Sequence, residues 1–107
     1  MHSRVTRFKV PPDKFDLVIR AMQARVDAGA QRYEDFHGFA GETLLMDRDR
    51  EETLLIAYYQ DKASMALSVE KARQLRDQIA GGLGVQVLSV REYVVAVSDI
   101  PSPITPG

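Results

Sequence analysis

The stretch FHGFAGETLLMDRDREETLLIAYY, residues 36–59, constrains the fold of this chain more than any other. Two apolar runs flank the charged segment 47–52, a pattern that predicts two strands joined by a turn. A half-buried strand should alternate apolar and polar side chains, but residues 44–46 and 54–57 are apolar without interruption. Both faces of the predicted hairpin therefore carry apolar groups that need cover.

The rest of the chain predicts two helices and two further strands. Apolar residues at spacings of three and four follow Pro11 and Pro12, which is typical of an amphipathic helix that begins just after a strand. Asp61 is a suitable N-cap for the second helix, which we expect to bend near Val69 and to end at the glycines of residues 81–84. Residues 31–37 are predicted to be a connection. The predicted elements are strands over residues 3–10, 38–47, 52–60 and 85–97 and helices over residues 12–28 and 61–80.

This order of elements, β-α-β-β-α-β, predicts an α+β, ferredoxin-like fold with a four-stranded antiparallel sheet. Residues 1–97 form one domain, and residues 98–107 are expected to be a flexible, proline-rich tail. The two helices can cover only one face of the sheet. Burying one Leu or Val contributes about 1.5–3 kcal/mol, so the apolar second face favours pairing with a second copy of the chain.

Charge and composition exclude several kinds of partner. The 107 residues include 14 basic and 15 acidic ones, a net charge of −1 that favours neither nucleic acid nor an anionic membrane. No apolar run is long enough for a membrane span, and no signal peptide is apparent, so we expect a cytoplasmic protein. The chain lacks cysteine and has only two histidines, so a catalytic metal site is not expected.

Three motifs carry a resemblance to a known family: GFAG at the start of the second strand, LLMD at its end, and YYQD at the end of the third strand. In these motifs the chain resembles the antibiotic biosynthesis monooxygenase (ABM) family of dimeric α/β-barrel proteins over residues 3–97. His37 stands where the family usually has proline, and Tyr59 where many members have tryptophan. The motifs are structural, so they indicate the fold more strongly than the chemistry.

The resemblance implies a homodimer whose two sheets close an eight-stranded barrel, with a small apolar cavity between sheet and helices in each subunit. Some members of the family oxidise phenols with molecular oxygen and no metal or flavin, and others degrade haem. The haem-degrading members have a histidine in the second helix and an asparagine in the first strand. Here Val69 and Thr6 stand near those positions, so no haem and no other cofactor is predicted.

Six residues are candidates for a site, and each also has a purely structural interpretation. His37 could act as a general base or be a loop residue in place of proline. Tyr58 and Tyr59 could bind a phenol, but as neighbours in a strand they should point to opposite faces. The family resemblance implies that Tyr59 is the better candidate for the cavity. Arg91 could bind a ligand carboxylate, pair with Glu42, or lie exposed. The predicted catalytic residues are His37 and Tyr59, and the predicted substrate-binding residues are Tyr58, Phe36, Tyr33 and Arg91.

Two functional hypotheses follow. The first is a cofactor-independent monooxygenase that oxidises a small hydrophobic, aromatic or quinol-like molecule in the cavity between sheet and helices. The second is a non-catalytic dimer that binds small molecules or is associated with stress. Oxygen consumption with model quinols separates the two.

Overall fold

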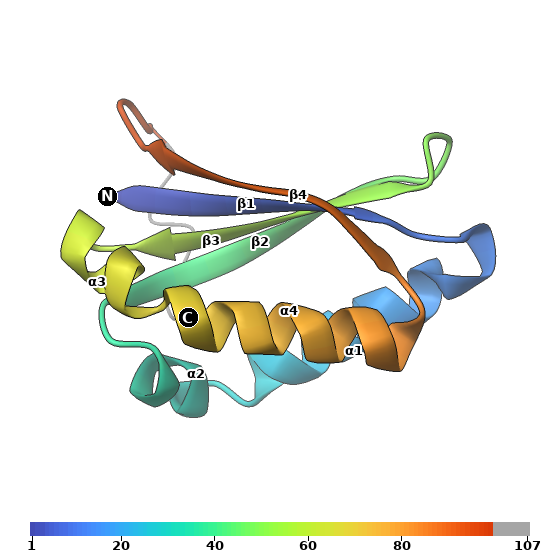
Figure 1. Cartoon of the computed structure of the whole chain (residues 1–107), viewed down its shortest axis with the longest axis horizontal. Coiled ribbons are helices and arrows are strands. Elements are labelled where there is room, and N and C mark those ends of the chain that lie inside the picture. The colour runs from blue at the N-terminus through green and yellow to red at the C-terminus, as the bar shows by residue number, and fades with distance from the viewer. Residues whose placement is uncertain (100–107) are drawn as a thin grey trace.

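The computed structural model describes residues 1–99, except for the side chains of residues 30–32. The predicted tail over residues 98–107 therefore lies almost entirely outside the described residues. Four strands, four α-helices and one short 3₁₀ turn make up the described chain (Figure 1). In order they are β1 (His2–Lys9), η1 (Pro12–Lys14), α1 (Phe15–Asp27), α2 (Ala30–Asp35), β2 (Phe39–Asp47), β3 (Glu52–Tyr59), α3 (Lys62–Leu67), α4 (Val69–Leu83) and β4 (Gln86–Val94).

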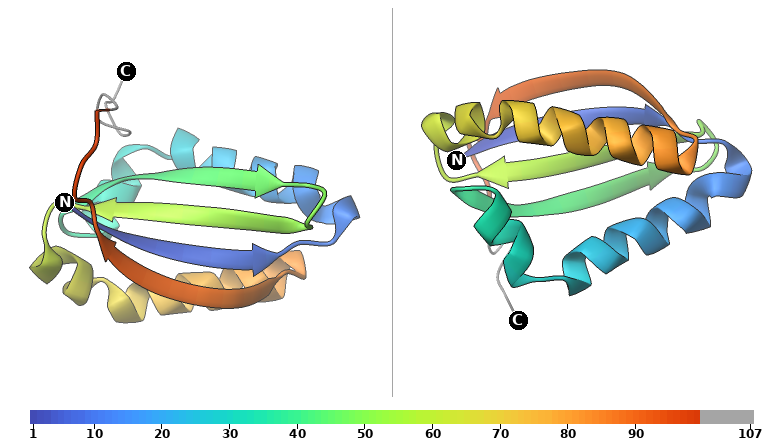
Figure 2. Two further views of the ribbon diagram at one scale, coloured as in Figure 1. Left: turned by 90° about the horizontal axis from the view of Figure 1, so that it is seen from above. Right: turned by 60° about the horizontal axis from the view of Figure 1, so that its bottom comes forward.

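The strands form one antiparallel sheet in the order β2-β3-β1-β4, which confirms the predicted ferredoxin-like fold. Helices α1 and α4 cover the same face of the sheet, and no described element covers the other face (Figures 1 and 2). The left view of Figure 2 looks directly onto this open face. The molecule thus has two layers, with its apolar core between them.

Local sequence sets where the second helical segment begins, breaks and ends. The Asp61 carboxylate accepts a hydrogen bond from the backbone N–H of Ser64 at 2.7 Å, as expected of an N-cap. The expected bend occurs at Ser68, whose hydroxyl donates to the Met65 carbonyl and which separates α3 from α4. Helix α4 ends at Gly84, which has the left-handed conformation that glycine adopts at low cost.

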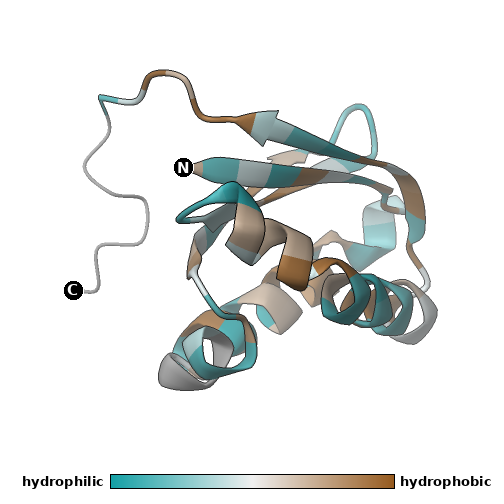
Figure 3. Ribbon diagram, turned by 60° about the vertical axis from the view of Figure 1, so that its left-hand side comes forward, coloured by the Kyte–Doolittle hydropathy of each residue, from teal (hydrophilic) through white to brown (hydrophobic). Residues whose placement is uncertain are grey.

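Three details differ from the predictions. Residues 30–35 form the short helix α2 where a connection was expected. Helix α4 continues through Gly81 and Gly82 to Leu83, because packing of the last turn outweighs the low helix propensity of glycine. Strand β4 ends at Val94, and the apolar chain that follows leaves the sheet (brown in Figure 3).

A bulge in β4 changes which of its residues face the helices. Phe8 pairs with Val87, whereas its neighbour Arg7 pairs with Ser89, so Leu88 is an extra residue in β4. Val87 therefore packs against the core, while Ser89 lies on the open face. The extra residue shifts the alternation of β4 by one position between Val87 and Ser89.

Successive side chains of each strand point to opposite faces of the sheet, one toward the helices and one open. Toward the helices, the buried side chains of Phe8, Phe15 and Val18 form one cluster, and those of Phe39, Tyr59 and Met65 form a second. On the open face, Val5 pairs with Ile56 in the two central strands. Further apolar side chains on this face are Leu45, Leu54, Tyr58 and Tyr93.

Candidate functional site

Two adjoining cavities lie between the sheet and the helices. The larger has a volume of about 210 Å³ and mostly apolar walls, and the smaller has about 40 Å³. Both follow β3, with Thr53 in the larger cavity, Leu55 in the wall of both, and Tyr59 in the smaller. Four residues contribute to both walls: Arg25, Leu55, Leu75 and Ile79.

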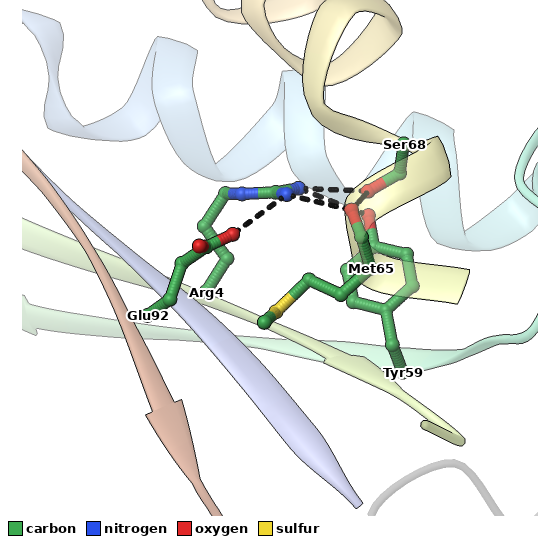
Figure 4. A network of polar contacts seen from close by, with 5 residues as sticks. All are labelled: Arg4, Tyr59, Met65, Ser68 and Glu92. Carbon is green, nitrogen blue, oxygen red and sulfur yellow. Dashed lines mark hydrogen bonds and ion pairs between the residues drawn. The ribbon is translucent and has the colours of Figure 1, made fainter. Parts of the chain in front are cut away.

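The smaller cavity is bordered by a buried arginine with four hydrogen-bond partners (Figure 4). Arg4 is 4% exposed and comes from β1. One terminal nitrogen donates to the Ser68 hydroxyl at 3.0 Å and to the Tyr59 hydroxyl at 3.4 Å. The other donates to the Met65 carbonyl and to the Glu92 carboxylate, each at 3.1 Å. These contacts join β1, β3, β4 and the break between α3 and α4, as a buried charge requires.

The Tyr59 side chain is fixed on both sides. It is 2% exposed, its ring lies edge-on to Phe39 at 5.8 Å between centroids, and the Arg4 guanidinium lies 5.4 Å from the ring centre. Its hydroxyl accepts a hydrogen bond from Arg4. Among the described residues, no group accepts the proton of the Tyr59 hydroxyl, so that proton is available to a molecule in the cavity.

Two further arginines line the smaller cavity. Arg25 from α1 donates twice to the Glu42 carboxylate of β2, at 3.1 and 3.4 Å. Arg76 from α4 makes no hydrogen bond or ion pair with any residue that the structure describes. Burial and the neighbouring positive charge of Arg4 lower the pKa of Arg76 below its ordinary value.

Thr53 contributes an unusual polar group to the larger cavity. It is 1% exposed, and its hydroxyl has no hydrogen-bond partner among the described residues. A buried hydroxyl without a partner is unfavourable by about 1–3 kcal/mol. A ligand with an acceptor or donor at this position would remove that cost.

Only some of the predicted site residues line either cavity. Tyr59 and Phe36 line the smaller cavity. Tyr58 and Arg91 lie on the open face, so Tyr58 and Tyr59 point to opposite sides of the sheet as expected. Tyr33 is 38% exposed and packs against Phe39, outside the cavity walls.

His37 is exposed in the turn before β2 and lies outside the walls of both cavities. The pairing of Arg91 with Glu42 was wrong, because Glu42 faces the helices and pairs with Arg25. The catalytic and binding roles assigned to these residues from the sequence stay predictions.

Sequence reasoning missed Arg4, Arg25, Thr53 and Arg76. Arg4 shares the alternation of Thr6 and Phe8, which was a signal that it faces the helices. Arg76 lies four residues after Ala72 and three before Ile79, at the edge of the apolar stripe of α4. Only the register of the sheet shows that these charges meet at one end of a cavity.

The described residues contain neither a metal-binding cluster nor a membrane-spanning helix. Residues 1–99 contain no cluster of three or more His, Asp or Glu side chains suited to a metal ion. None of the helices in this part of the chain has the length and apolar character needed to span a membrane.

Comparison with known proteins gives matches in structure. No protein-family model and no curated protein sequence matches the chain. Similar solved structures include a protein named "putative antibiotic biosynthesis monooxygenase" from Deinococcus radiodurans, with a TM-score of 0.62 at 14% identity, covering 92% of this chain and 95% of that one. A protein of the same name from Chloroflexus aurantiacus has a TM-score of 0.58 at 14% identity, covering 94% of this chain and 97% of that one.

A "dimeric ferredoxin-like protein" from an uncultured marine organism has a TM-score of 0.61 at 11% identity. That match covers 94% of this chain and 98% of the other. At such identities the likeness concerns the fold. The chain has the ferredoxin-like fold of these ABM-type proteins, and the resemblance drawn from its sequence is confirmed at that level.

Proposed function

We propose that the chain is an ABM-type monooxygenase that oxidises a small aromatic or quinol-like molecule in the cavity between sheet and helices, without a cofactor. One observation carries the proposal: the buried Tyr59 hydroxyl accepts a hydrogen bond from Arg4 at the cavity wall, and no described residue accepts its own proton. Such a hydroxyl, polarised by a fixed cation, suits the stabilisation of a phenolate oxygen in a mostly apolar site.

The substrate itself supplies all four electrons that reduce dioxygen in this reaction. Loss of a proton from a quinol gives a phenolate with carbanion character at a ring carbon. Dioxygen adds to that carbon, and the resulting hydroperoxide loses water. The net change converts hydroquinone and O₂ into hydroxyquinone and H₂O, so one oxygen atom enters the ring and no external reductant is needed. Tyr59 and Arg4 would hold the phenolate oxygen while the walls exclude water.

The functional unit of this proposal is a homodimer joined through the open face of the sheet. That face is apolar at its centre, where Val5 pairs with Ile56, and its rim includes Tyr93, which is 50% exposed. Leaving such groups in water is unfavourable by about 25 cal/mol for each Å² of apolar surface. A protein of similar structure is named a dimeric ferredoxin-like protein, which supports dimerisation.

Oxygen uptake tests the catalytic proposal. An oxygen electrode follows the protein with menadiol and with methylhydroquinone, against buffer alone, and mass spectrometry with ¹⁸O₂ identifies the product. The proposal expects uptake well above autoxidation and one labelled oxygen atom in a hydroxyquinone. Tyr59→Phe should reduce the rate at least tenfold. Binding of quinol with uptake equal to that in buffer would instead favour the non-catalytic, ligand-binding alternative.

A further inference from the structure

The polar end of the cavity holds one uncompensated positive charge. Arg4 pairs with Glu92, and Arg25 pairs with Glu42. Arg76 lines the same cavity and has no carboxylate partner among the described residues. Among the described side chains, three guanidinium groups therefore face two carboxylates, which leaves a positive charge that an anion would balance.

The surroundings of Arg76 disfavour its positive charge. Its side chain is half-buried, and both burial and the Arg4 charge disfavour its charged form, which is why its pKa is lowered. A guanidinium has only donors, so the cost is removed by an acceptor, and most fully by an anionic one. The other two arginines differ, because their donors already serve Glu92, Tyr59, Ser68, Met65 and Glu42.

The rest of the cavity has a different character. The larger part is walled mainly by apolar side chains, and its volume of about 210 Å³ exceeds the roughly 150 Å³ of a cavity that binds benzene. At its far end along β3 lies the partnerless hydroxyl of Thr53. The two adjoining cavities together thus present a cation in the smaller one, apolar walls in the larger one and a hydroxyl at the far end of the larger one.

From this arrangement we infer that the site takes a carboxylate-bearing aromatic molecule, with the carboxylate on Arg76 and the ring in the larger cavity. The planar fork of the guanidinium matches the two oxygens of a carboxylate. In such a quinol the reacting oxygen beside the carboxylate would meet Tyr59, and a second hydroxyl or carbonyl on the far side of the ring would meet Thr53. The inference rests on the proposed function and deepens it, since it makes the substrate an acidic phenol or quinol.

Calorimetric titration with redox-inert ligands tests the inference separately from catalysis. The probes are 2-naphthoate and its neutral counterpart 2-naphthamide, titrated at pH 7 into the full chain. The key variant is Arg76→Gln. The matched control is Arg73→Gln, because Arg73 also lies on α4 but forms exposed ion pairs with Glu70 and Asp77. Circular dichroism confirms that each variant is folded.

We expect 2-naphthoate to bind the wild type at least tenfold more tightly than 2-naphthamide does. Arg76→Gln should weaken naphthoate binding at least tenfold and change naphthamide binding less than twofold, while Arg73→Gln changes neither by more than twofold. A 6-hydroxyl on the naphthoate should improve affinity in the wild type but not in Thr53→Val, which lacks the hydroxyl.

Three results would overturn the inference: equal affinity for the acid and the amide, equal losses in Arg76→Gln and Arg73→Gln, or no binding of 2-naphthoate at 1 mM. Catalysis is decided by another measurement. Carboxylate binding that depends on Arg76, without oxygen uptake on a carboxylated quinol, would leave the inference standing and defeat the monooxygenase proposal. Oxygen uptake on neutral quinols, with no preference for carboxylated ones, would support the monooxygenase proposal and overturn the carboxylate inference.

Discussion

The guanidinium of Arg4 donates a hydrogen bond to the hydroxyl of Tyr59 and lies over the Tyr59 ring, although 55 residues separate the two in sequence. The pair connects the central strands β1 and β3 directly beneath the break between α3 and α4 (Figure 4). It fixes a polar end on an otherwise apolar cavity. Stability and the proposed chemistry therefore depend on the same contact.

Replacing Arg4 should destabilise the protein strongly. Arg4→Leu removes the donor to the Ser68 and Tyr59 hydroxyls and leaves the Glu92 carboxylate without its ion-pair partner, at a cost of about 2–4 kcal/mol. Urea denaturation followed by circular dichroism measures the change. The control is Arg7→Leu on the same strand, whose ion pair with Glu52 is exposed and should matter far less. Equal losses in the two variants would contradict the role given to Arg4.

Two glycines should respond to alanine in opposite directions. Gly38 has φ +71°, and a Cβ there would collide with the Ser64 hydroxyl, so Gly38→Ala should lose about 2–4 kcal/mol. Gly81 lies within α4 with open space around it, so Gly81→Ala should gain about 0.5–1 kcal/mol. The same urea experiment measures both. A loss of stability in Gly81→Ala would show that the last turns of α4 are not helical in solution.

The N-cap of α3 predicts a pH dependence. The hydrogen bond from the Ser64 backbone holds the pKa of Asp61 below its ordinary value of 3.8. A carboxyl with a lowered folded-state pKa stabilises the protein fully above 3.8, and the contribution is lost as the pH falls through the lower folded value. Asp61→Ala should therefore lower the Tm at pH 7, and the difference from wild type should shrink toward pH 2.

Asp49→Ala provides the control for that experiment, because Asp49 lies exposed in the β2–β3 turn. It should leave the Tm unchanged at neutral pH. Asp61→Asn should retain most of the wild-type Tm at pH 7, since an asparagine side chain can also cap a helix. A constant difference between wild type and Asp61→Ala from pH 7 to pH 2 would refute the assignment of the cap.

The proposed dimer predicts a change of mass on substitution of its face. By light scattering the wild type should have a mass near twice 12.0 kDa. Ile56→Asp places a charge at the centre of the open face and should give a monomer. Leu67→Asp is the control, because Leu67 is 74% exposed on α3, away from that face. A wild-type monomer, or dissociation of both variants alike, would contradict the dimer.

Patterns within short segments predicted much of this fold. Apolar runs bounded by turns and the apolar stripes of the helices gave the β-α-β-β-α-β order, and the uninterrupted apolar run over residues 54–57 indicated a sheet with two apolar faces. The Asp61 cap and the break near Val69 were equally local features. The bulge at Leu88 was not predictable, because it is defined only by the pairing of β4 with β1.

The site was harder to predict than the fold, for a physical reason. Tyr59 was a candidate, but alternation alone does not say which of Tyr58 and Tyr59 faces the helices. Arg4 and Arg76 are separated by most of the chain and become neighbours only when α4 packs on β1. A charged residue in a strand or on a helix is most often solvated, so nothing near either one in sequence marks it as part of a cavity.

Oxygen uptake by a pair of matched alanine variants tests the central claim, that oxidation takes place in the cavity, most directly. Ala72 lines the smaller cavity from α4, whereas Ala66 is exposed on α3, so both can be changed to leucine within a helix. With menadiol as substrate, the account predicts that Ala72→Leu loses at least tenfold in rate while Ala66→Leu matches the wild type. Equal rates in the three proteins, each shown to be folded, would contradict it.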